Sequence, residues 1–330
     1  MSLQVLDLDE AEPGAPGRVR FGEALLVCRA SEPDSLARHP DLVESAAFTL
    51  VDAPVDDRRA VRVDNLDEAC AAIAARVEAS PEAARVCDDV LRANAAHGQV
   101  FPGLVTESLA YSTLQGGPEF AAWLRAQPPR HRHESADAVR VELDGPGTTL
   151  TIEFNRPDKH NAFSNALRAG LLDGLDVALA SPGVTTCVLG GRGRSFCSGG
   201  DLREFGLFSN VAASHHARTR YSPAMSLDAV RRRLGGRFIA ELHGAVMGSG
   251  LEMAAFCGTV RADSTTRFGL PELTLGLIPG AGGTVSVTRR IGRWRTAYLI
   301  LSGEVIGTDV ARGWGLVDEV VPGAVYGAAA

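Results

Sequence analysis

The stretch Phe238-Ile-Ala-Glu-Leu-His-Gly-Ala-Val-Met-Gly-Ser-Gly-Leu-Glu252 carries the pattern that decides the fold. Its apolar start, Phe238–His243, is typical of a strand, and the glycine-rich run 244–249 that follows is typical of a tight turn. We expect a helix to begin at Gly250 and to run to about Cys257. Strand, turn and helix in this order predict an α/β unit.

A unit of the same kind precedes it in the chain. Two alternating runs, Val139–Leu143 and Thr149–Phe154, predict a β-hairpin, and a helix is expected from about 164 to 179. The apolar run Thr186–Gly190 predicts a buried strand, and a second glycine-rich turn follows at 196–202. The alternation of strand, turn and helix predicts an α/β fold for this part of the chain.

The first part of the chain has a different pattern. Residues 1–17 are acidic and rich in glycine and proline, which predicts a loose tail. Two short apolar runs, Ala24–Cys28 and Ala47–Val51, predict strands. The segments that follow have helical spacing and predict helices at 66–79, 80–96, 103–115 and 118–126.

The change between these two patterns predicts a domain boundary. The stretch 128–133 is basic and contains proline, and its His131 and His133 are typical of a linker rather than of a ligand set. We place the boundary near residue 135. Residues 1–135 are then an N-terminal extension, mostly helical with two short strands, and residues 136–330 are a core with a shortened C-terminus.

Composition predicts a soluble globular protein. The chain has 330 residues, of which 45% are hydrophobic, with a net charge of -7 and a pI near 5.7. No block of lysine and arginine with interleaved aromatic residues occurs, so we expect no nucleic-acid partner. The chain shows neither a signal-like start nor an apolar run of about 20 residues, so we expect no membrane partner and a cytoplasmic location.

The six cysteines and eight histidines show no pattern of a metal site or of a disulfide framework. The cysteines are scattered, without C-x-x-C or histidine-coupled spacing. We therefore expect buried thiols that act as small apolar side chains, and no metal ligands.

The two glycine-rich turns, 196–202 and 243–252, are the main candidates for chemistry. Glycine lets the backbone approach a ligand, and the amides of a helix's first turn point outward at the positive end of the helix dipole. Two such turns that converge would supply paired N–H donors for an oxyanion. Turns that use glycine only for their shape are an equally good explanation on the residues alone. Motifs for a P-loop, a dinucleotide site and a serine nucleophile elbow are absent from the sequence.

Five blocks of sequence follow one another at characteristic separations. They are Phe154-Asn-Arg-Pro-Asp-Lys-His-Asn-Ala-Phe163, Phe196–Leu202, His243–Glu252, Phe268–Glu272 with Gly276–Thr284, and Trp314–Asp318. In this order and spacing they resemble the enoyl-CoA hydratase/isomerase (crotonase) superfamily. The resemblance covers about Val139 to Pro322 and implies an α/β fold, a crotonase-like spiral of ββα units preceded by the mostly helical N-terminal region.

The resemblance implies chemistry on an acyl-CoA thioester, with no cofactor beyond the CoA of the substrate. The thioester oxygen would lie between the backbone N–H groups of Ser198 and Ser249, which would stabilise an enolate. Glu252 would orient and activate water, and Glu272 would exchange the proton at the α-carbon. On the residues alone, an acid in a helix's first turn or after a proline is ordinary, so both catalytic roles rest on the resemblance.

Further residues are implied to lie near the substrate. Arg156 and Lys159 would lie near the CoA phosphates, although exposed charges explain them too, and Asp201 would support the first oxyanion turn. Arg218 would contact a polar or aromatic acyl group, and a solvated helix face explains it equally well. The full set expected at the substrate or CoA is Arg156, Lys159, Gly199, Gly200, Asp201 and Gly250.

The chain departs from the superfamily pattern at both ends. Members continue beyond the block at 314–318 with helices that cover the acyl pocket and help to form a homotrimer or hexamer, whereas this chain stops at Ala330. It carries instead the N-terminal extension, with its distinctive stretch 107–120. We expect the helices of the extension to replace the missing cover and to shape the acyl site.

Both glutamates together favour hydration or dehydration of a 2-enoyl-CoA, a lyase activity of fatty acid metabolism. Isomerisation of an enoyl-CoA is one alternative. A second is a cofactor-independent dioxygenase of an aryl-acetyl-CoA, because the dihydroxyphenylacetyl-CoA dioxygenase branch has a similar N-terminal extension; Glu252 stands where that resemblance would place an amide. A third alternative is a non-catalytic protein that binds acyl-CoA.

Overall fold

A computed structural model describes the chain with short gaps, over residues 3–12, 24–32, 34–128, 137–208 and 210–322. The predicted linker, with His131 and His133, lies almost wholly outside the described residues, and so does the predicted boundary near residue 135.

A six-stranded sheet is the framework of the core. Its strand order is β13-β10-β8-β7-β6-β5, and all neighbours are parallel except β5 and β6. The hairpin and the buried strands that the sequence predicts are therefore confirmed. The strands are β5 (Val139–Leu143), β6 (Thr149–Phe154), β7 (Thr186–Gly191), β8 (Phe238–Leu242), β10 (Thr259–Asp263) and β13 (Glu319–Val321).

A second sheet of three strands carries the chain into the site, in the order β12 (Ile306–Gly307), β11 (Arg267–Gly269) and β9 (Ala245–Met247). The prediction of a turn throughout 244–249 is wrong at β9. Val246 is buried and bridges Cys197, so pairing with a distant segment holds the middle of the run in extended backbone.

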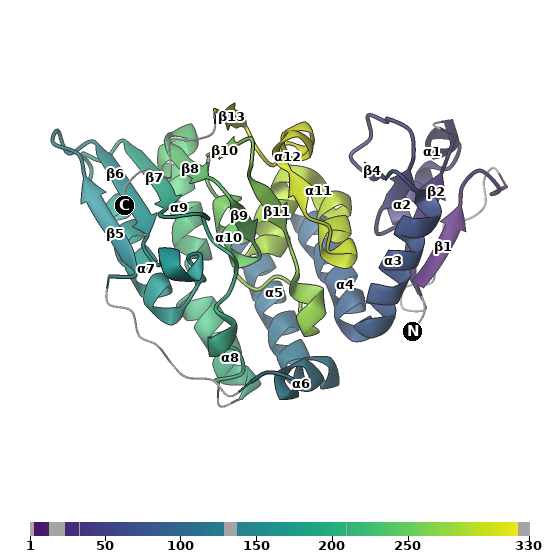
Figure 1. The fold of residues 1–330 in the computed structure, drawn as a ribbon, viewed down its shortest axis with the longest axis horizontal. Helices are drawn as coiled ribbons and strands as arrows, with labels where there is room; N and C mark the ends of the chain where they lie inside the picture. Colours follow the sequence, from purple (N-terminus) through teal and green to yellow (C-terminus); the bar gives the residue numbers. More distant parts are fainter. Residues whose placement is uncertain (1–2, 13–23, 33, 129–136, 209, 323–330) are drawn as a thin grey trace.

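Helices cover the sheets (Figure 1). Helix α7 (Asn165–Ala180) matches its prediction, and its cap Ser164 accepts the N–H of Leu167. Helix α10 (Ser249–Ala254) begins one residue earlier than predicted and is shorter. The remaining helices of the core are α8 (Val211–Arg220), α9 (Ala224–Leu234), α11 (Gly283–Ser302) and α12 (Thr308–Trp314), with 3-10 turns at η1 (Pro157–Lys159), η2 (Leu202–Glu204), η3 (Gly235–Arg237) and η4 (Glu272–Leu275).

The N-terminal region contains a parallel sheet of four strands rather than two strands. Its order is β1 (Leu3–Asp7), β2 (Leu25–Ala30), β3 (Thr49–Val51) and β4 (Ala60–Arg62). The prediction of a loose tail is wrong at β1, because Leu3 pairs with Leu25 and the nearby Leu8 is fully buried. Partners distant in the chain outweigh the acidic local composition here.

The four helices predicted in the N-terminal region are confirmed within a few residues. They follow two short helices that the sequence pattern did not reveal, α1 (Asp34–Arg38) and α2 (Pro40–Ser45). The predicted four are α3 (Leu66–Ala79), α4 (Pro81–His97), α5 (Val100–Gln115) and α6 (Pro118–Arg125). The described part of the chain is thus mixed α/β with a largely helical N-terminal region, as predicted.

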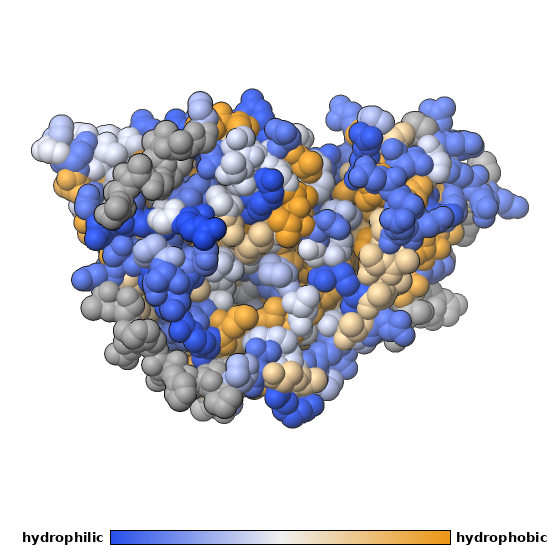
Figure 2. Space-filling view, viewed as in Figure 1, coloured by the Kyte–Doolittle hydropathy of each residue, from blue (hydrophilic) through white to orange (hydrophobic). Residues whose placement is uncertain are grey.

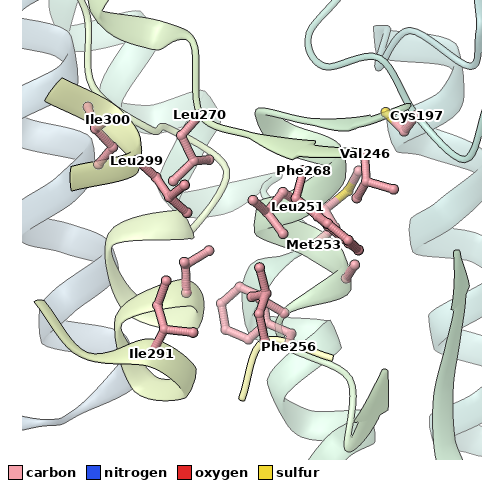
Figure 3. Packing of buried hydrophobic residues seen from close by; sticks show 14 of the residues in the cluster. Cys197, Val246, Leu251, Met253, Phe256, Phe268, Leu270, Ile291, Leu299 and Ile300 are labelled. Atoms are coloured by element: carbon pink, nitrogen blue, oxygen red, sulfur yellow. The ribbon is translucent and has the colours of Figure 1, made fainter. Parts of the chain in front are cut away.

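One hydrophobic cluster runs through both regions of the chain. It joins Leu91 of α4 and Leu114 of α5 to Ile291 and Leu299 of α11 and to the sheet residues behind them. Figure 3 shows the part around α10 and α11, where Leu251, Met253 and Phe256 lie across the cluster from Ile291 and Leu299. Figure 2 shows a mainly hydrophilic face with hydrophobic residues gathered toward its middle. The N-terminal helices therefore complete the core instead of standing apart from it.

Candidate active site

A cavity of about 380 Å³ lies where the two glycine-rich turns, α5, α7 and α8 meet. Its wall combines apolar side chains with carboxylates and two arginines. The residues at the wall that matter for the chemistry are Tyr111, Gln115, Phe163, Arg168, Gly200, Glu204, Phe205, Leu207, Phe208, Arg218, Ser249, Glu252 and Glu272. Both glutamates predicted to be catalytic thus share one cavity.

Glu252 lies in α10, and its residue is only 2% exposed. Its Oε2 accepts the N–H groups of Ala281 (2.6 Å) and Gly283 (2.8 Å), at the start of α11. Burial raises the pKa of Glu252 to about 7, while these backbone donors act in the opposite direction. A carboxyl with such a pKa can take up a proton at neutral pH, which a general base must do.

Glu272 opens the turn η4 directly after Pro271. Its Oε2 is shielded from solvent and has no hydrogen-bond partner among the described residues. Its Oε1 lies so near the turn that a Cβ on Gly248, which has φ +47°, would come within 2.6 Å of it. Burial, and next the charge of Glu252, raise the pKa of Glu272 well above its ordinary value.

The two glutamates therefore differ in their preferred protonation. Backbone amides stabilise the ionised form of Glu252, whereas the buried Oε2 of Glu272 has no donor in the part of the chain that the structure describes. Like charges in one cavity also oppose double ionisation. The arrangement favours a proton on Glu272 and a charge on Glu252, which provides one acid and one base at the same site.

A third buried carboxylate, Glu107 of α5, was not identified as a site residue from the sequence. It is 2% exposed, and it accepts the N–H groups of Gly282 (2.7 Å) and Thr284 (3.0 Å) and the hydroxyl of Thr284 (2.6 Å). Burial, followed by the charge of Glu252, raises the pKa of Glu107 to about 8. A sequence pattern could have revealed it. Glu107 lies four residues after Gly103 and four before Tyr111, so all three share the buried face of α5.

The prediction for the oxyanion donors is wrong at Ser198. The Ser198 amide donates to the carbonyl of His160 (2.9 Å), and Ser198 is exposed and lies outside the cavity wall. Gly200, two residues further on, does line the cavity, and its amide has no acceptor among the described residues. Ser249 also lines the cavity, and as the first residue of α10 it has an amide without an intrahelical acceptor.

Arg156 is buried in an ion pair, which does not fit the role predicted for it at the CoA phosphates. It is 3% exposed, and it donates to Asp201 Oδ2 (3.1 Å) and to the carbonyl of Ala162. Asp201 also accepts from the backbone and guanidinium of Arg203, so it caps η2 and supports the first glycine-rich turn. It lines the cavity as well, and its contact with a substrate stays a prediction. Arg156 and Asp201 together brace the first glycine-rich turn, and an arginine engaged in this way is not free to bind phosphate.

The other predicted substrate residues are not at the cavity wall. Gly199 is buried, and its carbonyl accepts the N–H of Phe163. Gly250 is buried against Cys197, which a Cβ would approach within 2.7 Å. Lys159 lies on η1, 3.5 Å from Asp158, and its role at the CoA phosphates stays a prediction.

Two arginines of the cavity wall complete the site. Arg218, for which the sequence left open an acyl contact or a solvated helix face, does line the cavity, with its guanidinium 3.7 Å from the ring centre of Tyr111. Arg168 of α7 was missed, because a single arginine on an amphipathic helix has no distinctive sequence signal.

The described residues contain no helix that is long and apolar enough to cross a membrane. They also contain no group of three or more histidine, cysteine or acidic side chains placed to hold a metal ion. The six cysteines are all free and buried.

The family model described as Enoyl-CoA hydratase/isomerase matches residues 145–328, which is more than half of the chain. This match agrees with the fold and with the site. The chain therefore belongs to the enoyl-CoA hydratase/isomerase family. Among curated proteins it is similar to 2,3-dehydroadipyl-CoA hydratase of Escherichia coli, with 37% identity over 52% of this chain and 66% of the relative. It is also similar to mevalonyl-coenzyme A hydratase SIDH of Beauveria bassiana, with 31% identity over 52% of this chain and 63% of the relative. The matched part thus spans slightly less than two thirds of these two relatives.

Solved structures agree with the family. The chain is similar to an enoyl-CoA hydratase subunit of Geobacillus kaustophilus, with 30% identity, a TM-score of 0.50, and coverage of 56% of this chain and 69% of the other. It is also similar to DspI of Pseudomonas aeruginosa, with 27% identity, a TM-score of 0.52, and coverage of 59% and 78%. The predicted crotonase-like fold is confirmed by these relationships.

Proposed function

We propose that the protein catalyses the reversible addition of water to a 2-enoyl-CoA. The observation that carries this proposal is the position of Glu252 and Glu272 in one cavity with the backbones of Gly200 and Ser249. The family and the hydratase relatives support it. The relatives named as hydratases favour hydration over the alternatives of an isomerase, a dioxygenase and a non-catalytic binding protein.

The backbone turns would stabilise the reacting thioester. The amides of Gly200 and Ser249 would donate to the thioester oxygen, on which negative charge develops as the enolate forms. Ser249 opens a helix, so its amide also carries the positive end of the helix dipole. This pair replaces the predicted pair of Ser198 and Ser249, because the Ser198 amide already donates a hydrogen bond to the carbonyl of His160.

The carboxyls would move the protons. A water oxygen bonds to the β-carbon while Glu252 takes the proton that this water loses, and Glu272 gives its own proton to the α-carbon. The product is a 3-hydroxyacyl-CoA, and a proton passing from Glu252 to Glu272 restores the starting state. Dehydration is the same sequence in reverse. No step requires a metal or a redox cofactor, since the CoA thioester is itself the substrate.

Hydration is tested with a panel of 2-enoyl-CoAs by the loss of absorbance of the conjugated thioester. We expect turnover by the native chain, and a decrease in kcat of about 100-fold or more for Glu252→Gln and for Glu272→Gln. Glu142→Gln, at an exposed position on β5, is the matched control and should keep full activity. A folded protein that hydrates no member of the panel would contradict the proposal.

We further propose that α5 shapes the acyl site, which is the role expected for helices of the N-terminal extension. Tyr111 and Gln115 of α5 line the cavity, which supports this role. Removing residues 1–135 would be a poor test, because α4 and α5 share the hydrophobic cluster with α11. Tyr111→Leu is better, and it should change the preferred acyl chain length in the same absorbance assay without unfolding the protein.

Assembly and location also remain proposals. Membership of the family supports a homo-oligomer, a trimer or hexamer, working on an acyl-CoA of fatty acid metabolism in the cytoplasm. Light scattering of the purified full-length chain would determine its mass in solution. A monomer at micromolar concentration would contradict the proposed assembly.

A further inference from the structure

Two guanidinium groups share the cavity without an acidic partner. Arg168 comes from α7 and Arg218 from α8, and both line the cavity. Among the described residues, neither has a carboxylate oxygen within 4 Å. Of the other arginines with little solvent exposure, Arg156 pairs with Asp201 and Arg290 with Asp318. Arg293 has no ion pair among the described residues, but it donates to the backbone carbonyls of Ala46 and Glu44.

Arg168 is partly withdrawn from water, and the charge of Glu204 compensates this only in part. Its side chain makes no hydrogen bond among the described residues. Burial lowers its pKa, and the charge of Arg218 acts in the same direction. The acid that opposes this effect most, Glu204, already accepts the N–H of Asn165 (2.7 Å). Such a cation in a cavity wall can bind an anion of a ligand.

Arg218 is held in place by neutral groups. Its Nη1 donates to the side-chain oxygen of Gln115 (3.3 Å) and to the carbonyl (3.3 Å) and hydroxyl of Ser214. The ring of Tyr111 lies under the guanidinium. These contacts orient the guanidinium, and no carboxylate oxygen of the described residues lies within 4 Å of it. Its planar donors are therefore held in place to bind a carboxylate.

The rest of the cavity suits an acyl chain. Phe163, Phe205, Leu207 and Phe208 provide apolar wall, and the volume of about 380 Å³ is near the small end for ligand pockets. That space fits an acyl group rather than a whole CoA molecule. An anion at the two arginines is therefore better placed on the acyl chain than on the nucleotide end of CoA.

We propose that Arg168 and Arg218 form a subsite for a carboxylate at the far end of the acyl chain, so that the substrate class is an ω-carboxy-2-enoyl-CoA. This inference rests on the proposed hydration. It makes the two arginines specificity-determining residues, since an uncharged chain would leave both cations without a partner.

The test uses the full-length chain and two pairs of probes. The first pair is the saturated six-carbon ω-carboxyacyl-CoA and hexanoyl-CoA, whose Kd values require no chemistry. The second is the corresponding pair of 2-enoyl-CoAs, compared by kcat/KM. We expect the carboxylated member to be preferred in both pairs by about 10-fold to 100-fold. Arg168→Gln and Arg218→Gln should each remove most of this preference, and Arg168→Lys should retain part of it. Arg220→Gln, exposed on the same helix as Arg218, should change nothing.

Several results would overturn the subsite. One is an equal affinity of the native chain for both saturated probes. Another is an equal weakening of both probes and of free CoA in the variants, which would place a CoA phosphate at the arginines. A third is that Arg218→Gln lowers kcat with the uncharged enoyl-CoA but leaves the preference for the carboxylated probe unchanged. Arg218 would then act as a counter-charge for Glu252 instead of binding the acyl carboxylate. If the binding preference and its loss are seen while no enoyl-CoA is hydrated, the subsite stands and the proposed hydration fails.

Discussion

Replacing Glu107 by alanine should destabilise the protein, because this side chain ties the N-terminal region to the catalytic loop. Its carboxyl accepts from the amides of Gly282 and Thr284 and from the Thr284 hydroxyl, and alanine leaves these buried donors without an acceptor. A buried donor left unpaired costs about 1–3 kcal/mol. The hydroxyl can rotate to another partner, so the two amides dominate the loss.

We therefore expect Glu107→Ala to lower the free energy of unfolding by about 3 kcal/mol, after allowing for relief of the repulsion from Glu252. Glu107→Gln keeps one acceptor oxygen and should lose about 1 kcal/mol. The same turn supplies the amides of Ala281 and Gly283 that hold Glu252, so kcat should fall in the alanine variant.

Urea unfolding followed by circular dichroism measures the first effect, and hydration of a 2-enoyl-CoA measures the second. Glu78→Ala, at an exposed position of α3, is the control and should match the native chain. If Glu107→Ala has the same midpoint of urea unfolding as the native chain, the hydrogen bonds between Glu107 and the loop contribute nothing to stability. If it is destabilised but keeps full kcat per folded molecule, the link is structural and does not position Glu252.

The remaining predictions concern pH and Gly248, the residue that precedes α10. The pKa values of Glu107 and Glu252 are raised to about 8 and about 7, and that of Glu272 is also raised, so the folded state binds their protons more tightly than the unfolded state does. This stabilisation is complete below about pH 4.5 and is lost as pH rises through 7 and 8. The free energy of unfolding, measured by urea titration, should therefore fall between pH 5 and pH 8. A free energy of unfolding that does not change over this range would contradict the assigned protonation. Gly248→Ala must adopt φ +47° and place its Cβ 2.6 Å from Glu272 Oε1, so it should lose about 1–3 kcal/mol of stability and most of kcat. Gly145→Ala, which has open space around it, should leave both unchanged, and equal behaviour of the two variants would show that the turn is not strained.

Local sequence pattern determined most of the elements and part of the site. The hairpin at β5 and β6, the strand β7 and the helices α3 to α7 follow from periodicity and turn residues, because these signals act over a few neighbouring residues. The order of the five blocks indicated the family. Glu252 and Glu272 were named from those blocks, and the tertiary structure brings both to one cavity.

Tertiary structure alone decided which atoms face that cavity. Ser198 and Gly200 belong to the same glycine-rich turn. Only the folded structure reveals that the Ser198 amide donates to the carbonyl of His160, which comes from another segment. Arg156 was predicted at the ligand and is instead buried against Asp201, while Arg168 was overlooked and lines the cavity. Such outcomes depend on pairings between segments far apart in the chain, which set burial and hydrogen bonding and which no local pattern of residues encodes.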